Sequence, residues 1–313
     1  MCRLKLGNFF QKFLLRFHFF DRVKLSLIIH VMIKIALYLF IYLLLVPKNS
    51  WAAGCCGGGG NSASIITGDL ESKWLWSLSL KNELGQTNSS GEYLQLNHNT
   101  YDQLWTQQFA YQKMIRDYWQ WGIALPLSKR FAQMANRSES SLGLSDLSTN
   151  IAFEFLPETF YSPFIPRGFL ILTLTLPTGN SRISSQKPLQ TNILGSGEFN
   201  YSLQNMYLKN LPLINISYGG EVKSESKMLF QTFSFFVGMH SPSFKSFSLG
   251  GMTHFKFHKN QNWSELDLNL AYEISPTINL NIHYLDTRLL TLSRSAKMFQ
   301  VFSFNLEFNT LAP

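Results

Sequence analysis

Long runs of alternating apolar and polar residues fill the C-terminal part of this chain. A β-strand has a period of two, so each run predicts one apolar face and one polar face. Strands of about ten residues, repeated to the chain end with one lipid-like and one water-like side, are what a barrel in a bilayer requires. The apolar positions of three such runs are Leu266, Leu268, Leu270, Tyr272 and Ile274; Ile278, Leu280, Ile282 and Tyr284; and Phe302, Phe304, Leu306 and Phe308.

The same alternation recurs toward the N-terminus and predicts about twelve strands in residues 54–313. We find no long helix and no sequence repeat in this part of the sequence. We therefore expect an all-β protein, an antiparallel transmembrane β-barrel. The alternative is a soluble β-sandwich with an aromatic core, but a sandwich buries only its inner faces and does not need so many long strands with an apolar face. The predicted strands are 74–84, 107–117, 118–128, 146–156, 168–177, 197–209, 213–223, 230–240, 246–258, 264–274, 277–287 and 299–309.

Connection lengths support this order of strands. In an even-stranded barrel with both termini in the periplasm, odd-numbered connections are extracellular loops and even-numbered connections are short turns. Four long predicted connections fall at odd positions, and 210–212 and 275–276, which are tight, fall at even positions. The even-numbered connection 157–167 is long for a turn, and 224–229, 241–245 and 259–263 do not discriminate. The four long odd-numbered connections are 85–106, 129–145, 178–196 and 288–298.

The net charge of +8 comes almost entirely from the N-terminus. Residues 1–53 carry eight of the 27 Lys and Arg residues and one of the 19 acids, so a basic nucleic-acid surface is not indicated. The segment resembles an export signal starting at Met32, with Lys34, the apolar run 35–46 and small residues at Ala52-Ala53. An uncleaved membrane anchor is the alternative. We expect a presequence at 1–53, a Gly-rich periplasmic tether at 54–72 and the barrel at 73–313.

Cysteine usage leaves two readings open. Ala52-Ala53-Gly54-Cys55 loosely resembles a lipobox, in which Cys55 would be cleaved and acylated, although Ala52 stands where Leu is usual. Alternatively, Cys55 and Cys56 form a vicinal disulfide or pair between chains. The run Gly57–Gly60 is not a phosphate-binding loop, because no Lys-Ser/Thr follows it.

The chain end carries a further sign of a bacterial outer-membrane protein. Phe304, Leu306 and Phe308 form the alternating aromatic ending by which such barrels are handed to the outer-membrane assembly machinery, although five residues follow here. The chain also holds 27 Phe, 12 Tyr and 7 Trp, which suits a lipid-facing wall with aromatic girdles.

Four short segments in the centre carry a family resemblance. They are Gly143-Leu144-Ser145-Asp146-Leu147, Leu174-Thr175-Leu176-Pro177-Thr178-Gly179, Gly195-Ser196-Gly197-Glu198-Phe199 and Asn215-Ile216-Ser217-Tyr218. Together they resemble the outer-membrane family named for the meta-pathway of phenol degradation. Ser145 replaces an expected glycine, and Asn200 lies near an expected acid. The resemblance implies an outer-membrane channel that passes small hydrophobic or aromatic compounds.

Motifs for catalysis or metal binding are scarce, so we expect no enzyme, no metal site and no cofactor. His254 and His258 share a strand face but lie ~13–14 Å apart, too far to bind one metal. The segment 143–147 lacks the second glycine of a nucleophile elbow. A barrel-embedded lipid hydrolase remains an alternative, although His240 and Ser241 would point to opposite faces of their strand.

The pattern therefore predicts a channel or transporter for small solutes in the bacterial outer membrane. The alternative is a structural or adhesive barrel or a lipoprotein. The expected partners are the lipid bilayer, the assembly machinery and a small-molecule solute. The polar positions expected to face the lumen, and so to contact the solute, are Glu265, Asp267, Asn269, His283 and Glu307.

Overall fold

The computed structural model describes the barrel and a short segment ahead of it. The described residues are 65–66, 70–88, 90, 92–95, 100–134, 137–158, 162, 164–180, 187–224, 232–241, 246–258, 261–287 and 297–311. The predicted presequence, Cys55 and most of the predicted tether lie outside them, so these expectations stay predictions. No helix within the described ranges is long and apolar enough to cross a membrane.

All twelve predicted strands are confirmed, and the described residues add two short ones. The predicted loop 85–106 contains the end of β1, all of β2 and the start of β3. The predicted loop 129–145 contains the end of β4 and all of β5. The strands are β1 (Leu70–Thr87), β2 (Tyr93–Gln95), β3 (Thr100–Arg116), β4 (Trp119–Met134), β5 (Arg137–Leu144), β6 (Leu147–Leu156), β7 (Arg167–Leu176), β8 (Asn200–Asn210), β9 (Asn215–Ser224), β10 (Thr232–His240), β11 (Phe247–His258), β12 (Gln261–Ser275), β13 (Ile278–Asp286) and β14 (Lys297–Leu311).

Alternation failed to predict β5 because its apolar face is too weak to show as a period of two. Its residues are mostly polar, and it pairs along its whole length with β4, from Leu127↔Leu144 to Met134↔Arg137. A strand can form in this way through backbone hydrogen bonds to a neighbour that is already in place. The segment 129–145 is therefore a two-stranded extension of the wall and not the irregular loop expected.

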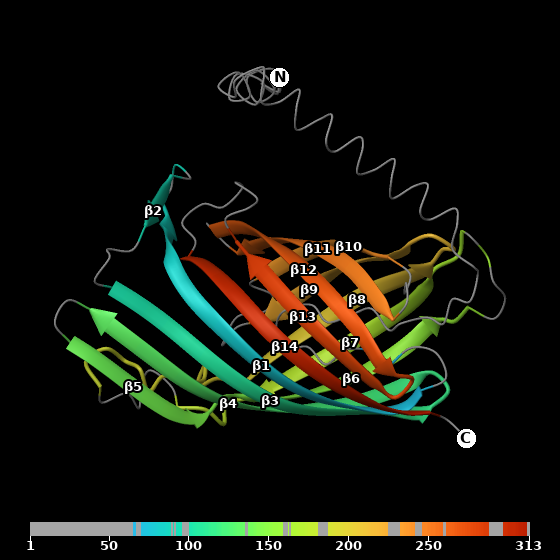
Figure 1. The fold of residues 1–313 in the computed structure, drawn as a ribbon, viewed down its shortest axis with the longest axis horizontal. Helices are drawn as coiled ribbons and strands as arrows, with labels where there is room; N and C mark the ends of the chain where they lie inside the picture. The colour runs from blue at the N-terminus through green and yellow to red at the C-terminus, as the bar shows by residue number, and fades with distance from the viewer. Residues whose placement is uncertain are drawn as a thin grey trace, which may run out of the picture. The chain divides into compact units, whose positions relative to one another are not determined.

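Twelve of the strands close into one antiparallel ring. Each pairs with the next along the chain, apart from the short β2 and β5, and β14 pairs with β1 to complete the wall. The seam has fifteen residue pairs, including Trp74↔Phe308 and Leu78↔Phe304. In Figure 1, β1 lies between β14 and β3. Closure leaves the strands of the ring without a free edge, and an exposed strand edge is costly in lipid.

The two faces of the wall differ as the alternation predicts. Large apolar side chains are exposed on the outer face, whereas many of the buried side chains are polar and lie on the inner face. On β12, for example, Leu268 is exposed and Asp267 is buried. This inverts the usual distribution in a soluble protein, where large apolar patches are seldom exposed. It is the distribution that a barrel in a bilayer needs.

The predicted separation of loops and turns to the two ends of the wall is confirmed only in part, because the long connection 157–166 lies at the end with the tight turns and the short connection 259–260 at the other. The end that carries the start of β1 and the end of β14 has tight connections at 117–118, 211–214 and 276–277. The opposite end carries the long connection from β7 to β8, whose described residues 177–180 and 187–199 contain no strand. Near the turn at 117–118, β3 has a register shift between Met114 and Arg116.

Candidate functional site in the barrel interior

The predicted lumen residues lie on β12, β13 and β14 and face the interior. Glu265, Asp267, His283 and Glu307 are nearly buried, at 3–7% exposure, and Asn269 is half-buried. Their side chains are therefore largely covered by other parts of the barrel. Their solute contacts stay a prediction.

Carboxylates on the inner face are paired with cations from neighbouring strands. Lys256 Nζ lies 2.8 Å and 2.9 Å from the two carboxylate oxygens of Glu265, which also accepts a hydrogen bond of 2.9 Å from Trp263 Nε1. Lys73 Nζ lies 2.7 Å from Glu307 across the β1–β14 seam. Buried charges are stable only when they are paired in this way. The pairs therefore link adjacent strands of the wall and neutralise these carboxylates.

Other ion pairs follow the same rule at other points of the wall. The guanidinium of Arg167 donates to both oxygens of Glu154, at 2.7 Å and 2.9 Å. Lys209 Nζ lies 2.5 Å from Glu158, and Arg130 pairs with Asp102. The described residues contain no group of three or more His, Cys, Asp or Glu side chains that could hold a metal ion.

An apolar cluster lies inside the otherwise polar barrel. Phe169 is completely buried, and Phe236 is 4% exposed. The ring of Phe236 lies over Gly219, where an added Cβ would meet the ring at 2.7 Å. Glycine therefore makes room for the aromatic side chain. The described members of the cluster are Ile65, Ala152, Phe169, Ile171, Met206, Phe236 and Met252, with Leu208 packed against them.

Sequence reasoning missed this cluster, although a signal was present. A strand with a polar inner face should alternate strictly, but the run Phe169–Leu172 and the run Phe235–Val237 do not. Unbroken apolar residues in a strand indicate burial on both faces. The breaks in alternation therefore marked the strands whose inner side is apolar.

Part of the predicted tether lies within this interior. Ile65 belongs to the apolar cluster, and Ile66 is 2% exposed. The side chain of Gln120 makes two hydrogen bonds to the backbone of Ile66, each 2.8 Å long. Its Oε1 accepts from the N–H of Ile66, and its Nε2 donates to the C=O. Gln112 in turn donates to Gln120 Oε1 at 3.2 Å. Ile65 and Ile66 thus pack inside the barrel that the following strands form. The first strand, β1, begins at Leu70, three residues before the predicted start of the barrel at residue 73.

Three of the segments that carry the family resemblance meet around one carboxylate. Asp146, in the break between β5 and β6, accepts hydrogen bonds from Gly179 N at 3.0 Å and from Ser196 N at 2.6 Å. Thr178 Oγ1 accepts from Leu147 N at 2.9 Å. Pro177, Thr178 and Gly179 directly follow the end of β7, and Thr178 and Gly179 are hydrogen-bonded to the start of β6 and the residue before it. These segments therefore fix the loop after β7 to the wall.

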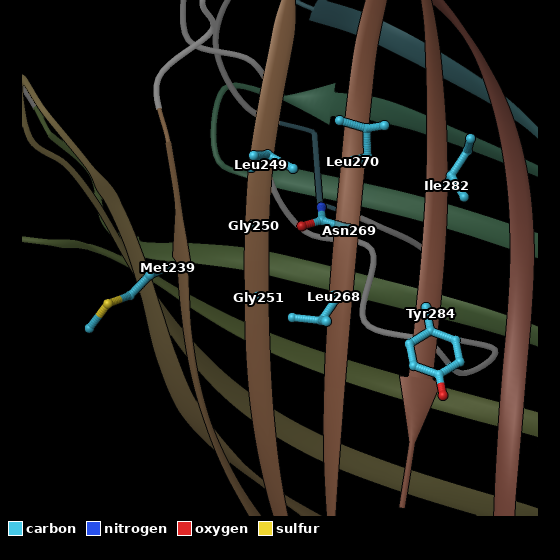
Figure 2. A pocket seen from close by; sticks show the side chains of 9 residues that line it. All are labelled: Met239, Leu249, Gly250, Gly251, Leu268, Asn269, Leu270, Ile282 and Tyr284. Carbon is cyan, nitrogen blue, oxygen red and sulfur yellow. The ribbon is translucent and has the colours of Figure 1, made fainter. Parts of the chain in front are cut away.

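A groove of about 580 Å³ lies on the outer face of β10–β13 (Figure 2). It exists because Gly251 has no side chain between exposed apolar neighbours such as Leu249 and Leu268. Its lining is nearly all apolar, and it belongs to the outer surface of the wall. The candidate site is therefore the interior with its apolar cluster, and not this groove.

Comparison with known proteins agrees with this architecture. No protein-family model and no curated protein matches the sequence. The fold is similar to that of an outer-membrane channel from Pseudomonas putida F1, with a TM-score of 0.59 and 10% identity over 79% of this chain and 100% of that chain. A second similar structure is the β domain of the Bordetella autotransporter BrkA, with a TM-score of 0.47 and 10% identity over 77% of this chain and 100% of that chain. A third is the KdgM porin, with a TM-score of 0.46 and 5% identity over 76% of this chain and 99% of that chain. The chain has the fold of an outer-membrane β-barrel.

Proposed function

We propose that this protein is a channel for small solutes with an apolar part, located in the bacterial outer membrane. The observation that carries the proposal is the apolar cluster around Phe169 and Phe236 inside a barrel whose other inner positions are largely polar. A water-filled pore for sugars or ions has no need of such a cluster. A binding region for an apolar solute is lined predominantly by apolar and aromatic side chains.

The outer wall supports the proposed location. Leu268, Ile282 and Phe304 are among the many apolar side chains exposed on its outer face, where lipid would cover them. We further propose that Phe304, Leu306 and Phe308 are read by the assembly machinery, since Phe304 and Phe308 lie exposed on the last strand of the ring. The resemblance of three interacting segments to the phenol meta-pathway family supports a channel of that kind.

Two adjacent phenylalanines on β10 provide a matched test. Phe236 faces the cluster at 4% exposure, whereas Phe235 faces outward at 60%. The purified full-length protein is inserted in planar bilayers, and single-channel current is measured with and without benzyl alcohol. We expect saturable block by benzyl alcohol in the wild type. The same block is expected in Phe235→Ser, because this substitution does not touch the interior. Phe236→Ser should weaken the block by about tenfold, the effect of losing roughly 1.4 kcal/mol of apolar contact.

Absence of single-channel current from correctly folded protein would contradict the channel function and favour a structural or adhesive barrel. Equal weakening of the block by both substitutions would show that benzyl alcohol acts through the bilayer and not in the barrel.

A further inference from the structure

Lys81 is an inward-facing cation that solvent can reach. It lies on β1, on the same face as Lys73, whereas Trp74 and Leu78 on this strand point outward. Lys73 is only 6% exposed, whereas Lys81 is exposed. A solute in the barrel interior could therefore contact its ammonium group.

Lys81 differs from Lys73, Lys256 and Arg130 on the inner face because it has no carboxylate partner among the described residues. Among the described residues, no Asp or Glu oxygen lies within 4.0 Å of Lys81 Nζ, and Glu83, two residues along β1, is paired with Lys297 at 2.8 Å. The next carboxylates around the wall are engaged as well, Asp102 with Arg130 and Glu265 with Lys256. Lys81 is therefore a surplus positive charge in this part of the interior.

The surroundings of Lys81 are aromatic and aliphatic. Its Nζ lies 3.9 Å from the centre of the Phe299 ring. Its partners in the two neighbouring strands are Val301 on β14 and Leu104 on β3, and Val301 in turn pairs with the buried Leu285 on β13. An aromatic face stabilises a cation without using its hydrogen-bond donors. An ammonium has three donors and no acceptor, so those of Lys81 remain available to an anionic group.

We infer that Lys81 and Phe299 form a binding subsite for small solutes that carry a carboxylate on an apolar body. The carboxylate accepts hydrogen bonds from Lys81 Nζ, and the body packs against Phe299, Val301 and Leu104. The neighbouring carboxylates do not repel the solute strongly, because each already has a cationic partner. This inference rests on the proposed channel function and narrows its substrate class to amphipathic acids.

The chain offers a matched control for the test. Lys129 on β4 also lies over an aromatic ring, with Nζ 4.6 Å from the centre of Phe131, but it lies on the outer face of the wall. The full-length protein is compared with Lys81→Met, Lys81→Arg and Lys129→Met. Two quantities are measured for each: block of single-channel current by benzoate, benzyl alcohol and acetate, and binding of the same three probes to the detergent-solubilised protein by calorimetry.

We expect benzoate to bind and block more tightly than acetate or benzyl alcohol in the wild type. Lys81→Met should weaken the benzoate interaction at least about tenfold, the effect of losing one charge-assisted contact, and leave benzyl alcohol unchanged. Lys81→Arg should retain most of the benzoate affinity, and Lys129→Met all of it.

Failure of the subsite and failure of the channel give different results. Unchanged benzoate affinity in Lys81→Met, in a protein that conducts, overturns the subsite and leaves the channel standing. Equal affinity for acetate and benzoate overturns the amphipathic class, because a simple anion site would then be present. A barrel that never conducts refutes the channel, while the calorimetric comparison still decides whether Lys81 binds the acid.

Discussion

The outer face of β12 gives the sharpest test of how the barrel sits in a bilayer. Leu268 is the central residue of this strand, which runs from Gln261 to Ser275, and its side chain is 45% exposed. Ile274 lies on the same face, one residue before the strand end, and is 53% exposed. The two positions are therefore chemically alike and differ mainly in their distance from the middle of the strand.

The expected depths follow from strand geometry. Six residues at about 3.4 Å each place Leu268 and Ile274 about 20 Å apart along the strand. With a tilt of about 45°, this is about 14 Å along the membrane normal, close to half of a hydrocarbon core of about 30 Å. If Leu268 lies at the midplane, Ile274 lies at the interface. An arginine at a midplane position on the lipid face costs about 2–4 kcal/mol, whereas near the interface it costs about 0–1 kcal/mol.

The assay is urea unfolding of the protein folded into phosphatidylcholine vesicles, monitored by tryptophan fluorescence. We expect Leu268→Arg to lower the free energy of unfolding by about 2–4 kcal/mol and Ile274→Arg by less than about 1 kcal/mol. Equal losses for the two variants, or no loss for Leu268→Arg, would refute the placement of this face in lipid. A soluble sandwich would show losses that do not depend on the presence of vesicles.

Three further outcomes can be measured on the same protein. Glu307→Leu should lower the unfolding free energy by about 3–5 kcal/mol because it leaves Lys73 as an unpaired buried charge, and adding Lys73→Met should recover most of this loss. Gly250→Ala should destabilise the barrel by about 1–3 kcal/mol, because the added Cβ would lie 2.0 Å from Nδ1 of His240. Gly251→Ala should be tolerated, because its added Cβ would have no neighbour closer than 3.4 Å. A cysteine at Ser140, exposed on β5, should react with an impermeant maleimide on intact cells; labelling only after outer-membrane rupture would reverse the proposed orientation.

Local sequence pattern was sufficient to locate the strands of the wall. The alternation in segments such as 264–274 depends on neighbouring residues alone, because side chains of a strand point to opposite faces whatever the strand pairs with. The same rule identified Asp267 as inward-facing and Leu268 as outward-facing. It failed for β5, whose pairing with β4 leaves little periodic signal.

The contents of the interior depended on contacts between residues far apart in the chain. The ion pair Lys73–Glu307 requires the first strand to meet the last. The hydrogen bonds between Gln120 and the backbone of Ile66 bring the end of the predicted tether into the barrel. No periodicity encodes such contacts, because they follow from ring closure and from the register of each strand pair.

The sequence by itself thus determined the strands and their two faces, since both are properties of a few consecutive residues. Only the tertiary structure decided which inner charges are paired, that Lys81 is not, and that Phe236 and Ile65 share an apolar cluster. The physical reason is that a side chain's face is set by its own strand, whereas its partners are set by the curvature and closure of the whole wall.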